Sequence, residues 1–377
     1  MSFDYDVHVC LVSGQAAPNL LPVLDEQFAP KSGRIFMLVT PDMRKNAAGL
    51  AEVFKKHGLR TEMVSIKNPY DLDLIQEELI TFFAKAENKK AVLNATGGTK
   101  IMALAAHSVF SMEKRPTLYV REDTNSLIIM PNSDTGEKTH SADLNSKLTL
   151  ADYLRAYGFT TENSPQKDIH KHAFSQEMIA NIDKYQDGLR LLNRKARDNN
   201  GNPVLSFVED STDIIKRMRE LLTLCENYQF IEFNNNKVKF ADEDAHTYIC
   251  GGWLEFHTHF IINSLLRKHI QTKAEQNLVI KEGESTMNEL DIVFLARNTL
   301  HLVECKTAKL DRENDSAVLY NLKTIMQFTG LKTKSMLVTY RELGVPHKKR
   351  AKKYRIKVVE GSALCHLKDS LEKWITE

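Results

Sequence analysis

Short apolar runs alternate with amphipathic stretches across the first 130 residues of this 377-residue chain. The runs predict strands at 7–12, 34–40, 60–66, 91–94, 117–120 and 127–130. The stretches between them predict helices at 20–28, 43–57, 72–86 and 100–110. Several runs are too continuously apolar for a strand with one wet face, which indicates strands buried on both sides. Strands and helices that take turns form a parallel sheet covered on both faces, so the sequence predicts a Rossmann-like α/β fold. In such sheets a ligand binds beyond the carboxyl ends of the strands.

The length of the chain is sufficient for two or three domains. Two polar segments without an apolar period, 131–146 and 160–171, mark the first boundary. We therefore expect a Rossmann-like domain over residues 1–150, a small helical connector over 172–245 and a second α/β domain over 246–377.

The connector is expected to consist of helices at 173–193 and 211–228 and a hairpin at 230–240 that turns at Asn234, Asn235 and Asn236. Helices followed by a hairpin are compatible with a winged helix. No clearly basic recognition helix stands out, so a structural connector is the simpler interpretation. In the second α/β domain, the pattern predicts a helix at 251–267, strands at 289–296 and 300–306, a helix at 317–329 and a strand at 334–338.

With 42% hydrophobic and 27% charged residues, the composition is that of a folded globular chain and excludes a disordered or low-complexity protein. No apolar stretch has the length of a membrane span, and the N-terminus has two aspartates but no basic region before its apolar run. We therefore expect a cytoplasmic protein with no membrane partner. The five cysteines are far apart and form no CxxC pair, so buried free thiols are expected instead of a zinc site or a disulfide framework.

The net charge is close to balance, at +2, but cations gather near the C-terminus. Residues 331–358 contain ten Lys or Arg and one acid, Glu342. A cluster of positive charge attracts phosphate groups, and binding of a phosphate-bearing partner to it weakens as the salt concentration rises. A solvated loop and helix face is the alternative interpretation.

The residues with the strongest chemical signal lie in the predicted hairpin near residue 300. Asp291 is expected to open its first strand, and Glu304 and Lys306 to close its second strand after a tight turn at 297–299. Because side chains alternate along a strand, Glu304 and Lys306 share one face, and the hairpin brings Asp291 opposite them. Two such carboxylates can hold one Mg²⁺ or Mn²⁺ ion, which polarises a phosphate and lowers the pKa of a bound water. The lysine would place a positive charge beside the attacking water.

Two further residues extend this set. Glu255 lies at the start of a helix whose apolar residues are expected to pack on the sheet, which makes it a third candidate metal ligand. Gln327, on the helix after Lys306, is a candidate for orienting substrate or water. The alternative for the whole set is a salt-bridged strand, but the residues next to Glu304 are apolar, which favours a charged end on a buried strand.

With Glu255, Asp291 and the Glu304-Cys-Lys306 triplet, the C-terminal region resembles the PD-(D/E)xK phosphodiesterases. Leu290 stands where that family often has a proline. The resemblance implies a restriction-endonuclease-like α/β domain that cleaves phosphodiester bonds with a divalent metal.

Two polar loops are predicted at one edge of the N-terminal sheet. One follows the first strand and supplies Ser13, Gly14, Gln15 and Asn19, and the other leads into a helix and supplies Asn94, Thr96, Gly97, Gly98, Thr99 and Lys100. Glycines at a strand-to-helix turn let backbone N–H groups approach an anion at the positive end of the helix. The turn lacks the glycine that a Walker A loop requires before its lysine, so hydrolysis of a nucleoside triphosphate is not predicted. A glycine-rich turn that serves only sheet geometry is the alternative.

Together these loops resemble the CARF domain, the Rossmann-like sensor of cyclic oligoadenylates in type III CRISPR systems. With its PD-(D/E)xK region, the chain resembles a CRISPR-associated ancillary nuclease over nearly its whole length. The resemblance implies a homodimer that binds cyclic tetra-adenylate across its two-fold axis and is thereby activated to cleave single-stranded RNA or DNA. Two alternatives remain. One is a ligand-responsive transcription regulator that binds duplex DNA through residues 172–245 and has a silent nuclease domain, and the other is an ungated repair or restriction nuclease.

Overall fold

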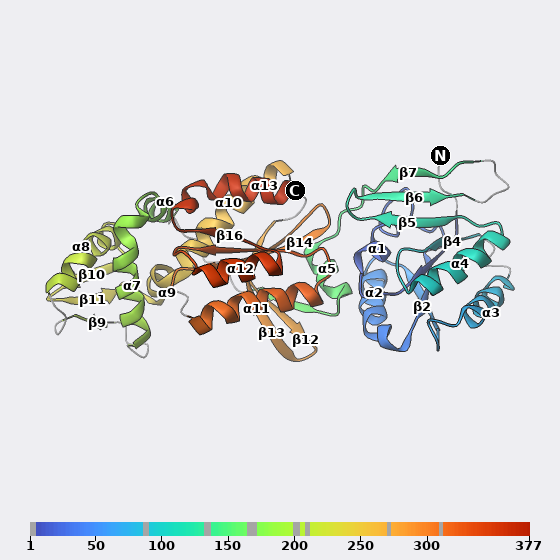
Figure 1. Cartoon of the computed structure of the whole chain (residues 1–377), viewed down its shortest axis with the longest axis horizontal. Helices are drawn as coiled ribbons and strands as arrows, with labels where there is room; N and C mark the ends of the chain where they lie inside the picture. Colours follow the sequence, from blue (N-terminus) through green and yellow to red (C-terminus); the bar gives the residue numbers. More distant parts are fainter. Residues whose placement is uncertain are drawn as a thin grey trace.

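A computed structural model describes residues 5–85, 90–131, 137–163, 172–198, 204–207, 212–269, 273–308 and 312–377. Figure 1 shows three bodies in a row, with the N-terminal sheet at one end, the connector at the other and the second sheet between them. Residues 86 and 211, where two helices were expected to end and to begin, lie outside the described residues.

The N-terminal sheet has seven strands in the order β3-β2-β1-β4-β5-β6-β7. Their bounds are β1 Val7–Leu11, β2 Arg34–Val39, β3 Arg60–Ser65, β4 Ala91–Asn94, β5 Thr117–Arg121, β6 Ser126–Met130 and β7 His140–Asp143. Strands β1 to β5 pair in parallel, and β6 and β7 are antiparallel additions. All six predicted strands are present. β7 was not predicted because its sequence, HSAD, has no apolar alternation.

Helices cover both faces of this sheet, as predicted. They are α2 (Arg44–Lys56), α3 (Leu72–Phe83) and α4 (Lys100–Met112). Side chains alternate along β1, so Val9 packs in the core beneath α3 and α4 while Cys10 packs in the core beneath α2. A strand that contributes to two cores needs apolar residues at successive positions, which explains the continuous apolar run in the sequence.

The first helix is much shorter than predicted. Helix α1 spans only Ala17–Leu20, and turns replace the helix expected over 20–28. Pro22 has no N–H group to donate to the carbonyl of Pro18, which is the helical bond that would continue α1. The side chain of Asn94 donates to that carbonyl instead, with an Nδ2–O distance of 2.9 Å. The apolar spacing predicted a helix here, and the proline stops it.

The connector combines helices α6 (His172–Ala180), α7 (Ile182–Asp198) and α8 (Thr212–Asn227) with strands β9 (Val204–Ser206), β10 (Ile231–Asn234) and β11 (Lys237–Phe240). The helix predicted over 173–193 is two helices separated at Asn181. The predicted hairpin is present, and Asn235 and Asn236 form its turn with φ of 50° and 57°. Positive φ at both central residues is the signature of a type I′ turn, which asparagine tolerates.

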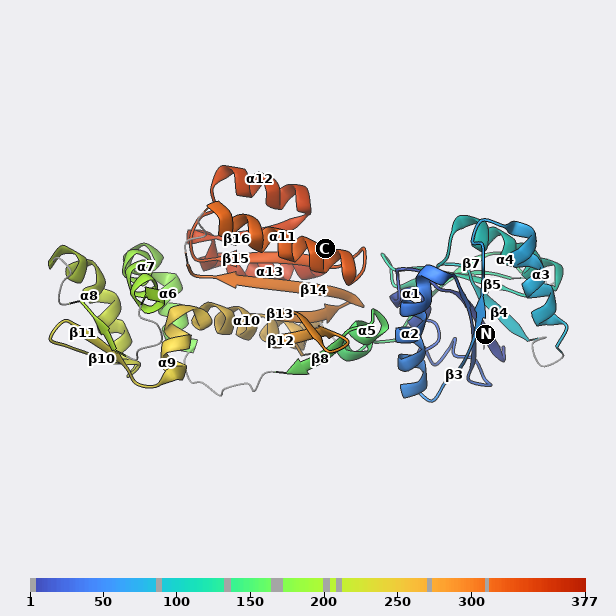
Figure 2. The same cartoon turned by 90° about the horizontal axis from the view of Figure 1, so that it is seen from below.

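The second sheet has six strands in the order β16-β15-β14-β13-β12-β8. They are β8 Thr160–Asn163, β12 Glu275–Glu282, β13 Ser285–Ala296, β14 Thr299–Lys306, β15 Lys334–Thr339 and β16 Ile356–Glu360. The surrounding helices are α9 Glu243–Thr247, α10 Trp253–His269, α11 Arg312–Phe328, α12 Val345–Tyr354 and α13 Leu367–Thr376. Figure 2 shows α11 and α12 on one side of the sheet and α10 on the other. β8 comes from a segment that the sequence analysis left outside all three domains.

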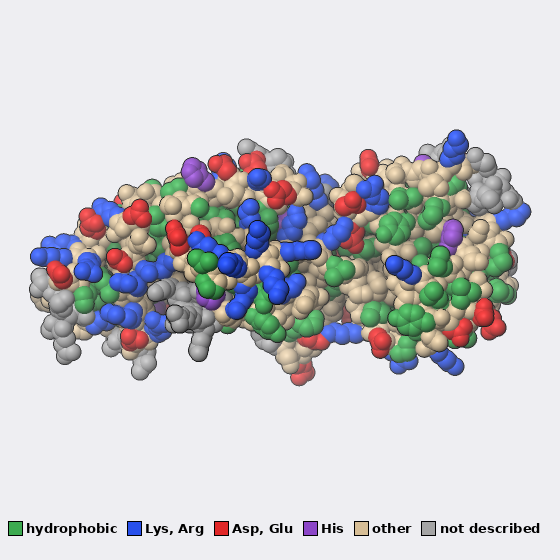
Figure 3. Space-filling model, in the orientation of Figure 1, with side chains coloured by type: hydrophobic (Ala, Val, Ile, Leu, Met, Phe, Trp, Pro, Cys, Tyr) green, Lys and Arg blue, Asp and Glu red, His purple; other side chains and the backbone are tan. Residues whose placement is uncertain are grey.

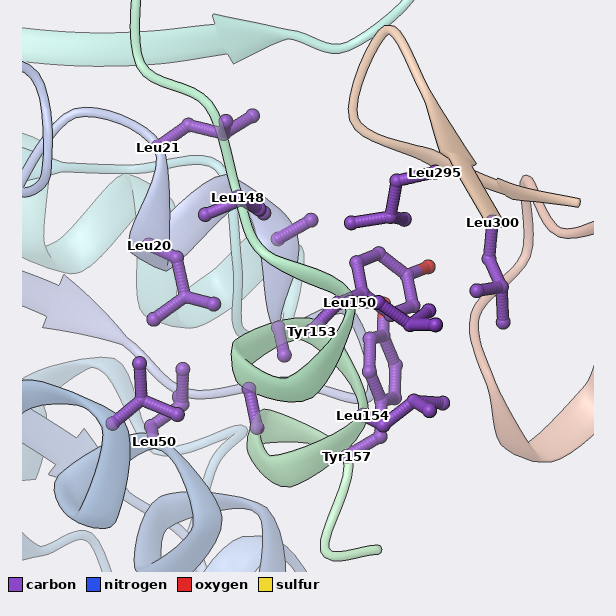
Figure 4. Packing of buried hydrophobic residues seen from close by; sticks show 14 of the residues in the cluster. Leu20, Leu21, Leu50, Leu148, Leu150, Tyr153, Leu154, Tyr157, Leu295 and Leu300 are labelled. Carbon is purple, nitrogen blue, oxygen red and sulfur yellow. The ribbon is translucent and has the colours of Figure 1, made fainter. Parts of the chain in front are cut away.

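A short helix, α5 (Leu150–Ala156), joins the N-terminal domain to the second sheet. Figure 4 shows Leu150, Tyr153 and Leu154 between helices of the N-terminal domain and Leu295 and Leu300 of the second sheet. All of them belong to one buried cluster. Since burying a large apolar side chain contributes roughly 1.5–3 kcal/mol, this shared core holds the two domains together.

The cysteines were expected to be buried, and the structure corrects this for one of them. All five cysteines are free, and Cys10, Cys225 and Cys305 are buried, while Cys250 is half-buried and Cys365 is exposed. The place of Cys365 in the short 3-10 helix before α13 could not be inferred from its isolated position in the sequence.

We predict that His301, in the core of the second sheet, makes the protein sensitive to acid. The imidazole is 1% exposed and stacks on Phe294, and burial lowers its pKa to about 3. The unfolded chain therefore takes up a proton on this residue below about pH 6.5 while the folded chain does not, so stability is lost as the pH falls from that value towards 3. Between pH 7 and pH 5 this one group accounts for about 2 kcal/mol of the unfolding free energy.

Denaturant unfolding at the two pH values tests this prediction. His301→Phe is expected to reduce the difference by about 2 kcal/mol. His366→Phe, at an exposed position, serves as the control and should leave the difference unchanged. An equal acid sensitivity in wild type and His301→Phe would contradict the assignment.

Candidate active site and ligand-binding edge

The predicted hairpin is formed by β13 and β14, and its acidic residues converge on one lysine. Lys306 Nζ lies 2.7 Å from Glu304 Oε1 and 3.4 Å from Asp291 Oδ2. The same Asp291 oxygen accepts a hydrogen bond of 2.8 Å from the backbone N–H of Cys305. Asp291 does not open its strand as expected, because β13 begins at Ser285 and continues as the partner of β12. The side chains nevertheless meet as the spacing predicted.

The lysine and both carboxylates point to the face of the sheet that α11 and α12 cover. Leu302 on β14 and Leu337 on β15 pack in the same core as α11, whereas Val303 packs in the core with α10. Because side chains alternate, Glu304 and Lys306 lie on the same face as Leu302. The charged cluster thus lies where the apolar part of β14 ends.

The pairing between β12 and β13 is interrupted at Asp291. On β12, Gln276 and Leu278 pair with residues of β13, but Asn277, which lies between them and opposite Asp291, does not. The backbone of Asn277 has a φ of 53°. A left-handed residue inside a strand turns its backbone away from its partner. The distortion leaves the Asp291 backbone unpaired with β12 at the position of the cluster.

Glu255 reaches the same cluster from the first turn of α10. Thr307, directly after Lys306, donates to the carbonyl of Cys250 at 3.2 Å and ties the turn before α10 to the end of β14. Trp253 is fully buried edge-to-face against Tyr340, with ring centroids 5.1 Å apart, and fixes the first turn of the helix. These two contacts hold the start of α10 at the charged end of the sheet.

The electrostatics of the cluster are those of an excess of buried negative charge. Burial raises the pKa of Glu255 above the usual range for a carboxyl, and Asp291 raises it further. Burial and then Asp291 likewise raise the pKa of Glu304, although Lys306 opposes the shift. For Lys306 the two carboxylates outweigh burial, so its pKa is raised and the ammonium stays charged. Added positive charge would stabilise this site.

Gln327 is not part of the cluster. It is exposed in the last turn of α11, and α11 connects the end of β14 to the start of the parallel strand β15. The helix therefore runs away from Lys306, and a helix of 17 residues spans about 25 Å. Gln327 does lie on the helix after Lys306, as predicted, but the structure does not bring its side chain to the cluster.

By its chemistry, though not by its spacing in the described residues of this structure, the donor set fits a hard divalent cation. Carboxylate oxygens are the ligands that Mg²⁺ and Mn²⁺ prefer, and burial together with neighbouring carboxylates raises the pKa of both Glu255 and Glu304. In the described part of the chain, no three His, Cys, Asp or Glu side chains are close enough to one another to hold an ion. The Lys306 ammonium sits between Asp291 and Glu304 and takes the place that a cation would have between two carboxylates.

The two polar loops of the N-terminal domain lie side by side. They follow β1 and β4, which are neighbours in the sheet, and the connections from these strands lead in opposite directions across it. This is the position at which open α/β sheets bind ligands. The predicted loop residues are therefore brought to one edge.

Two buried asparagines join these loops. Asn94 donates to the carbonyl of Pro18 at 2.9 Å and to Asn19 Oδ1 at 3.4 Å. Asn19 donates in turn to the carbonyl of Leu11 at 3.1 Å. Both side chains are fully buried, so they position the loops and are not exposed to a ligand.

The hydroxyl groups of the loops also shape the backbone. Thr96 donates to Asn94 and accepts from the Val120 N–H, both at 2.7 Å. Thr99 caps α4 by accepting from Met102 N at 3.1 Å. Ser13 accepts from the Gln15 N–H at 3.2 Å. These residues were predicted to bind the ligand, and in this structure their side chains form hydrogen bonds with the protein itself.

The glycines let the second loop approach β1 closely. A Cβ atom on Gly97 would lie 2.0 Å from the carbonyl oxygen of Leu11, and Gly98 has a φ of +71°. Any larger residue at Gly97 would displace the loop. Gly14 and Lys100 are exposed at this edge, and Lys100 begins α4. An anion here would meet the helix N-terminus, the lysine and exposed backbone.

Two contacts link this edge and its domain to the second sheet. Gln15 Oε1 accepts a hydrogen bond of 3.2 Å from the backbone N–H of Leu331, in the loop between α11 and β15. In the same loop, Thr329 accepts from the Tyr153 hydroxyl at 2.8 Å. Gly330 lies between them, where a Cβ atom would be 2.6 Å from the hydroxyl of Tyr157. A residue of the first polar loop thus contacts the loop that leads into β15, which nothing in the sequence indicated.

The tip of the β13–β14 hairpin makes the second contact. Arg297 and Asn298 form its two-residue turn with φ of 50° and 57°. Asn298 accepts from the Leu148 N–H at 3.1 Å and donates to Asn125 Oδ1 at 2.9 Å and to the carbonyl of Ser146 at 3.1 Å. The hairpin that bears Asp291, Glu304 and Lys306 is therefore held at its other end by the N-terminal domain.

Comparison with known proteins identifies both domains. A family model described as the Card1 CARF domain matches residues 7–153, and one described as the Card1-like endonuclease domain matches residues 242–377. A search of curated protein sequences gave no match.

Solved structures resemble the whole chain. The protein VC1899 from Vibrio cholerae is 23% identical with a TM-score of 0.85, and the match covers 98% of each chain. Can2 from Sulfobacillus thermosulfidooxidans, solved in complex with cyclic tetra-adenylate, is 27% identical with a TM-score of 0.80, over 99% of this chain and 98% of Can2. A type III CRISPR defence DNA nuclease activated by cyclic oligoadenylate is 17% identical with a TM-score of 0.56, over 90% of this chain and 46% of that one, and shows likeness of fold alone.

None of the helices in the described parts of the chain combines the length and the apolar character that crossing a membrane requires.

Proposed function

The chain joins a Card1-type CARF domain to a Card1-like endonuclease domain, and from this premise we propose that it is a nuclease of type III CRISPR defence that cyclic oligoadenylate activates. The proposed ligand is cyclic tetra-adenylate, the molecule bound in the Can2 structure. The proposed substrate is single-stranded RNA or DNA. The observation that carries the proposal is the convergence of Asp291 and Glu304 on Lys306 in the endonuclease domain.

In the proposed reaction, water attacks a backbone phosphorus atom, a bond from the water oxygen to phosphorus forms, and the bond to the leaving oxygen breaks. Lys306 places its ammonium against the negative charge that grows on the phosphate oxygens. Asp291, fixed by the Cys305 N–H, holds the lysine in place. The proton that the water loses passes to solvent, and the leaving oxygen takes up a proton from solvent.

The proposed metal ligands are Glu255, Asp291 and Glu304, whose side chains would have to move closer together to share an ion. A bound Mg²⁺ or Mn²⁺ would polarise the scissile phosphate and lower the pKa of water. The partly buried negative charge supports the assignment, because burial and then Asp291 raise the pKa of both Glu255 and Glu304.

The substrate class follows from a comparison of four labelled oligonucleotides in Mn²⁺ with cyclic tetra-adenylate: single-stranded RNA, single-stranded DNA, and a duplex of each. The proposal predicts cleavage of at least one single strand in preference to its duplex. Cleavage of duplex alone, or of none of the four, would contradict it.

The proposed ligand site is the loop edge beyond β1 and β4. Gly97, Gly98 and the start of α4 offer backbone N–H groups to a phosphate, and Lys100 adds positive charge. We propose that two copies of the chain present these loops to the two halves of the cyclic ligand, since a two-fold axis suits a symmetric ring. The ligand would then activate the nuclease by shifting the equilibrium between an inactive and an active state, which requires that it binds the active state more tightly.

The contacts of Gln15 and Asn298 give this activation a physical route. A ligand that moves the loop at Gln15 would also move the loop at Leu331, because the two are hydrogen-bonded. A shift of the CARF domain would likewise move the hairpin tip, because Asn298 is hydrogen-bonded to Asn125. The hairpin is about 20 Å long from Asn298 to Glu304, so it transmits a rigid displacement to the charged cluster.

We predict that Asn298→Gly weakens the coupling between the domains. Glycine keeps the positive φ of the turn but removes all three side-chain hydrogen bonds to the CARF domain. Couplings between sites are typically worth 1–3 kcal/mol, so the ratio of cleavage rates with and without ligand should fall about tenfold. Cleavage kinetics at saturating ligand and without ligand measure this ratio.

Asn236→Gly is the matched control, because Asn236 occupies the equivalent position of the connector hairpin, is exposed and has the same φ. It should leave the activation ratio unchanged. An unchanged ratio in Asn298→Gly as well would show that the hairpin tip does not transmit activation.

A further inference from the structure

Helix α12 carries a dense set of cations on its exposed side. Lys349, Arg350, Lys352 and Lys353 are all exposed, and no Asp or Glu lies between Glu342 and Glu360. Figure 3 shows Lys and Arg side chains gathered on the face of the molecule that α12 covers.

Most of this charge has no partner. Lys348 pairs with Glu360 at 2.5 Å, and Arg350 donates to the Ser316 hydroxyl. Lys349, Lys352 and Lys353 form no ion pair with the described residues. Three exposed ammonium groups on one short helix therefore attract anions.

Helix stability accounts for only part of this charge. Lys352 and Lys353 lie in the last turn of α12, where the helix dipole favours cations. Lys349 lies nearer the start of the helix, where the dipole opposes a cation, and it is four residues from Lys353, a spacing at which like charges destabilise a helix by a few tenths of a kcal/mol. Lys349 in particular therefore favours a role in binding.

The position of α12 connects these cations to the candidate active site. Lys306, Thr339 and Glu360 are register partners across β14, β15 and β16 at the same edge of the sheet. Lys348 anchors the start of α12 to Glu360. Two strand spacings, about 10 Å, separate the backbones of Lys306 and Glu360. Helix α12 then runs towards the start of β16, so Lys349 lies nearer the catalytic lysine than Lys352 and Lys353 do. Lys306 and α12 are on the same face of the sheet.

We propose that the exposed face of α12, through Lys349, Lys352 and Lys353, binds the phosphate backbone of the nucleic-acid strand that the cluster cleaves. This inference rests on the proposed function for its substrate. The contacts are to phosphate, so the helix adds affinity and position but no base preference. It binds the strand on one side of the scissile bond, with Lys349 nearer to that bond than Lys352 and Lys353.

The test replaces all three lysines at once, Lys349→Ala, Lys352→Ala and Lys353→Ala, because alanine preserves the helix. The control changes three exposed lysines of the CARF domain in the same way: Lys55→Ala, Lys85→Ala and Lys90→Ala. Binding of a fluorescent single-stranded oligonucleotide is measured between about 50 and 300 mM salt, in an Asp291→Asn background that prevents cleavage.

Loss of three phosphate contacts should make the fall of log affinity with log salt shallower, reducing the magnitude of its slope by about 2. Binding near 0.1 M salt should weaken at least tenfold. The control triple should bind like the parent, and both triples should bind cyclic tetra-adenylate equally well. An unchanged slope in the α12 triple, or an equal loss in the control, would overturn the inference. Binding is measured without turnover, so a protein that binds through α12 but never cleaves would refute the proposed function and not this inference.

Discussion

Lys306→Met is expected to reduce the cleavage rate by roughly a hundred- to a thousandfold while ligand affinity is unchanged. Removing one preorganised group that stabilises transition-state charge has effects of this size. Lys306 is also the only cation that the structure places between Asp291 and Glu304 within the described residues, so its loss leaves their repulsion unopposed. Single-turnover cleavage at saturating ligand measures the effect.

Lys239→Met is the control for this change, since Lys239 is an exposed strand lysine of the connector. Asp291→Asn is a second variant that keeps a side-chain oxygen for the Cys305 N–H but removes the negative charge. Both active-site variants should bind cyclic tetra-adenylate like wild type, which shows that they fold. Wild-type cleavage by either of them would exclude the cluster as the catalytic centre.

Gly97→Ala is expected to abolish activation by ligand. The new methyl group would lie 2.0 Å from the Leu11 carbonyl oxygen, a contact that only displacement of the loop can relieve. Loss of two charge-assisted hydrogen bonds, at about 1.5–3 kcal/mol each, weakens ligand binding by a hundredfold or more. Calorimetric titration with cyclic tetra-adenylate measures the affinity, and the cleavage assay reports activation.

A milder variant separates loss of the site from loss of folding. Lys100→Glu changes an exposed side chain at the same edge and should also weaken the ligand, because it reverses the charge beside the phosphate. Lys90→Glu lies before β4, at the opposite edge of the sheet, and should not. Normal ligand affinity in both Gly97→Ala and Lys100→Glu would place the ligand site elsewhere.

The sequence predicted those features that depend on local patterns. The run at β1 is apolar at successive positions because the strand contributes to two cores, and this alone indicated a doubly covered sheet. The hairpin at Asp291 and Glu304 was predictable because its period of two is combined with a two-residue turn at Arg297 and Asn298. In both cases the residues that determine the structure are neighbours in the chain.

The features that were missed depend on distant partners. The end of α1 requires Pro22 together with Asn94, which takes over the carbonyl that the proline leaves unpaired. Gln327 was assigned from its helix without knowledge that α11 runs away from Lys306. The contacts of Gln15 and Asn298 join residues more than 150 positions apart, and no pattern in one sequence reports them.

Cleavage rate as a function of cyclic tetra-adenylate concentration tests most directly whether the CARF domain controls the Asp291, Glu304 and Lys306 cluster. Wild type in Mn²⁺ with a labelled single strand should cleave slowly without ligand, reach a saturating fast rate as ligand is added, and lose this response in Lys306→Met. A full rate without ligand, or no cleavage at any concentration of ligand and metal, would contradict the account.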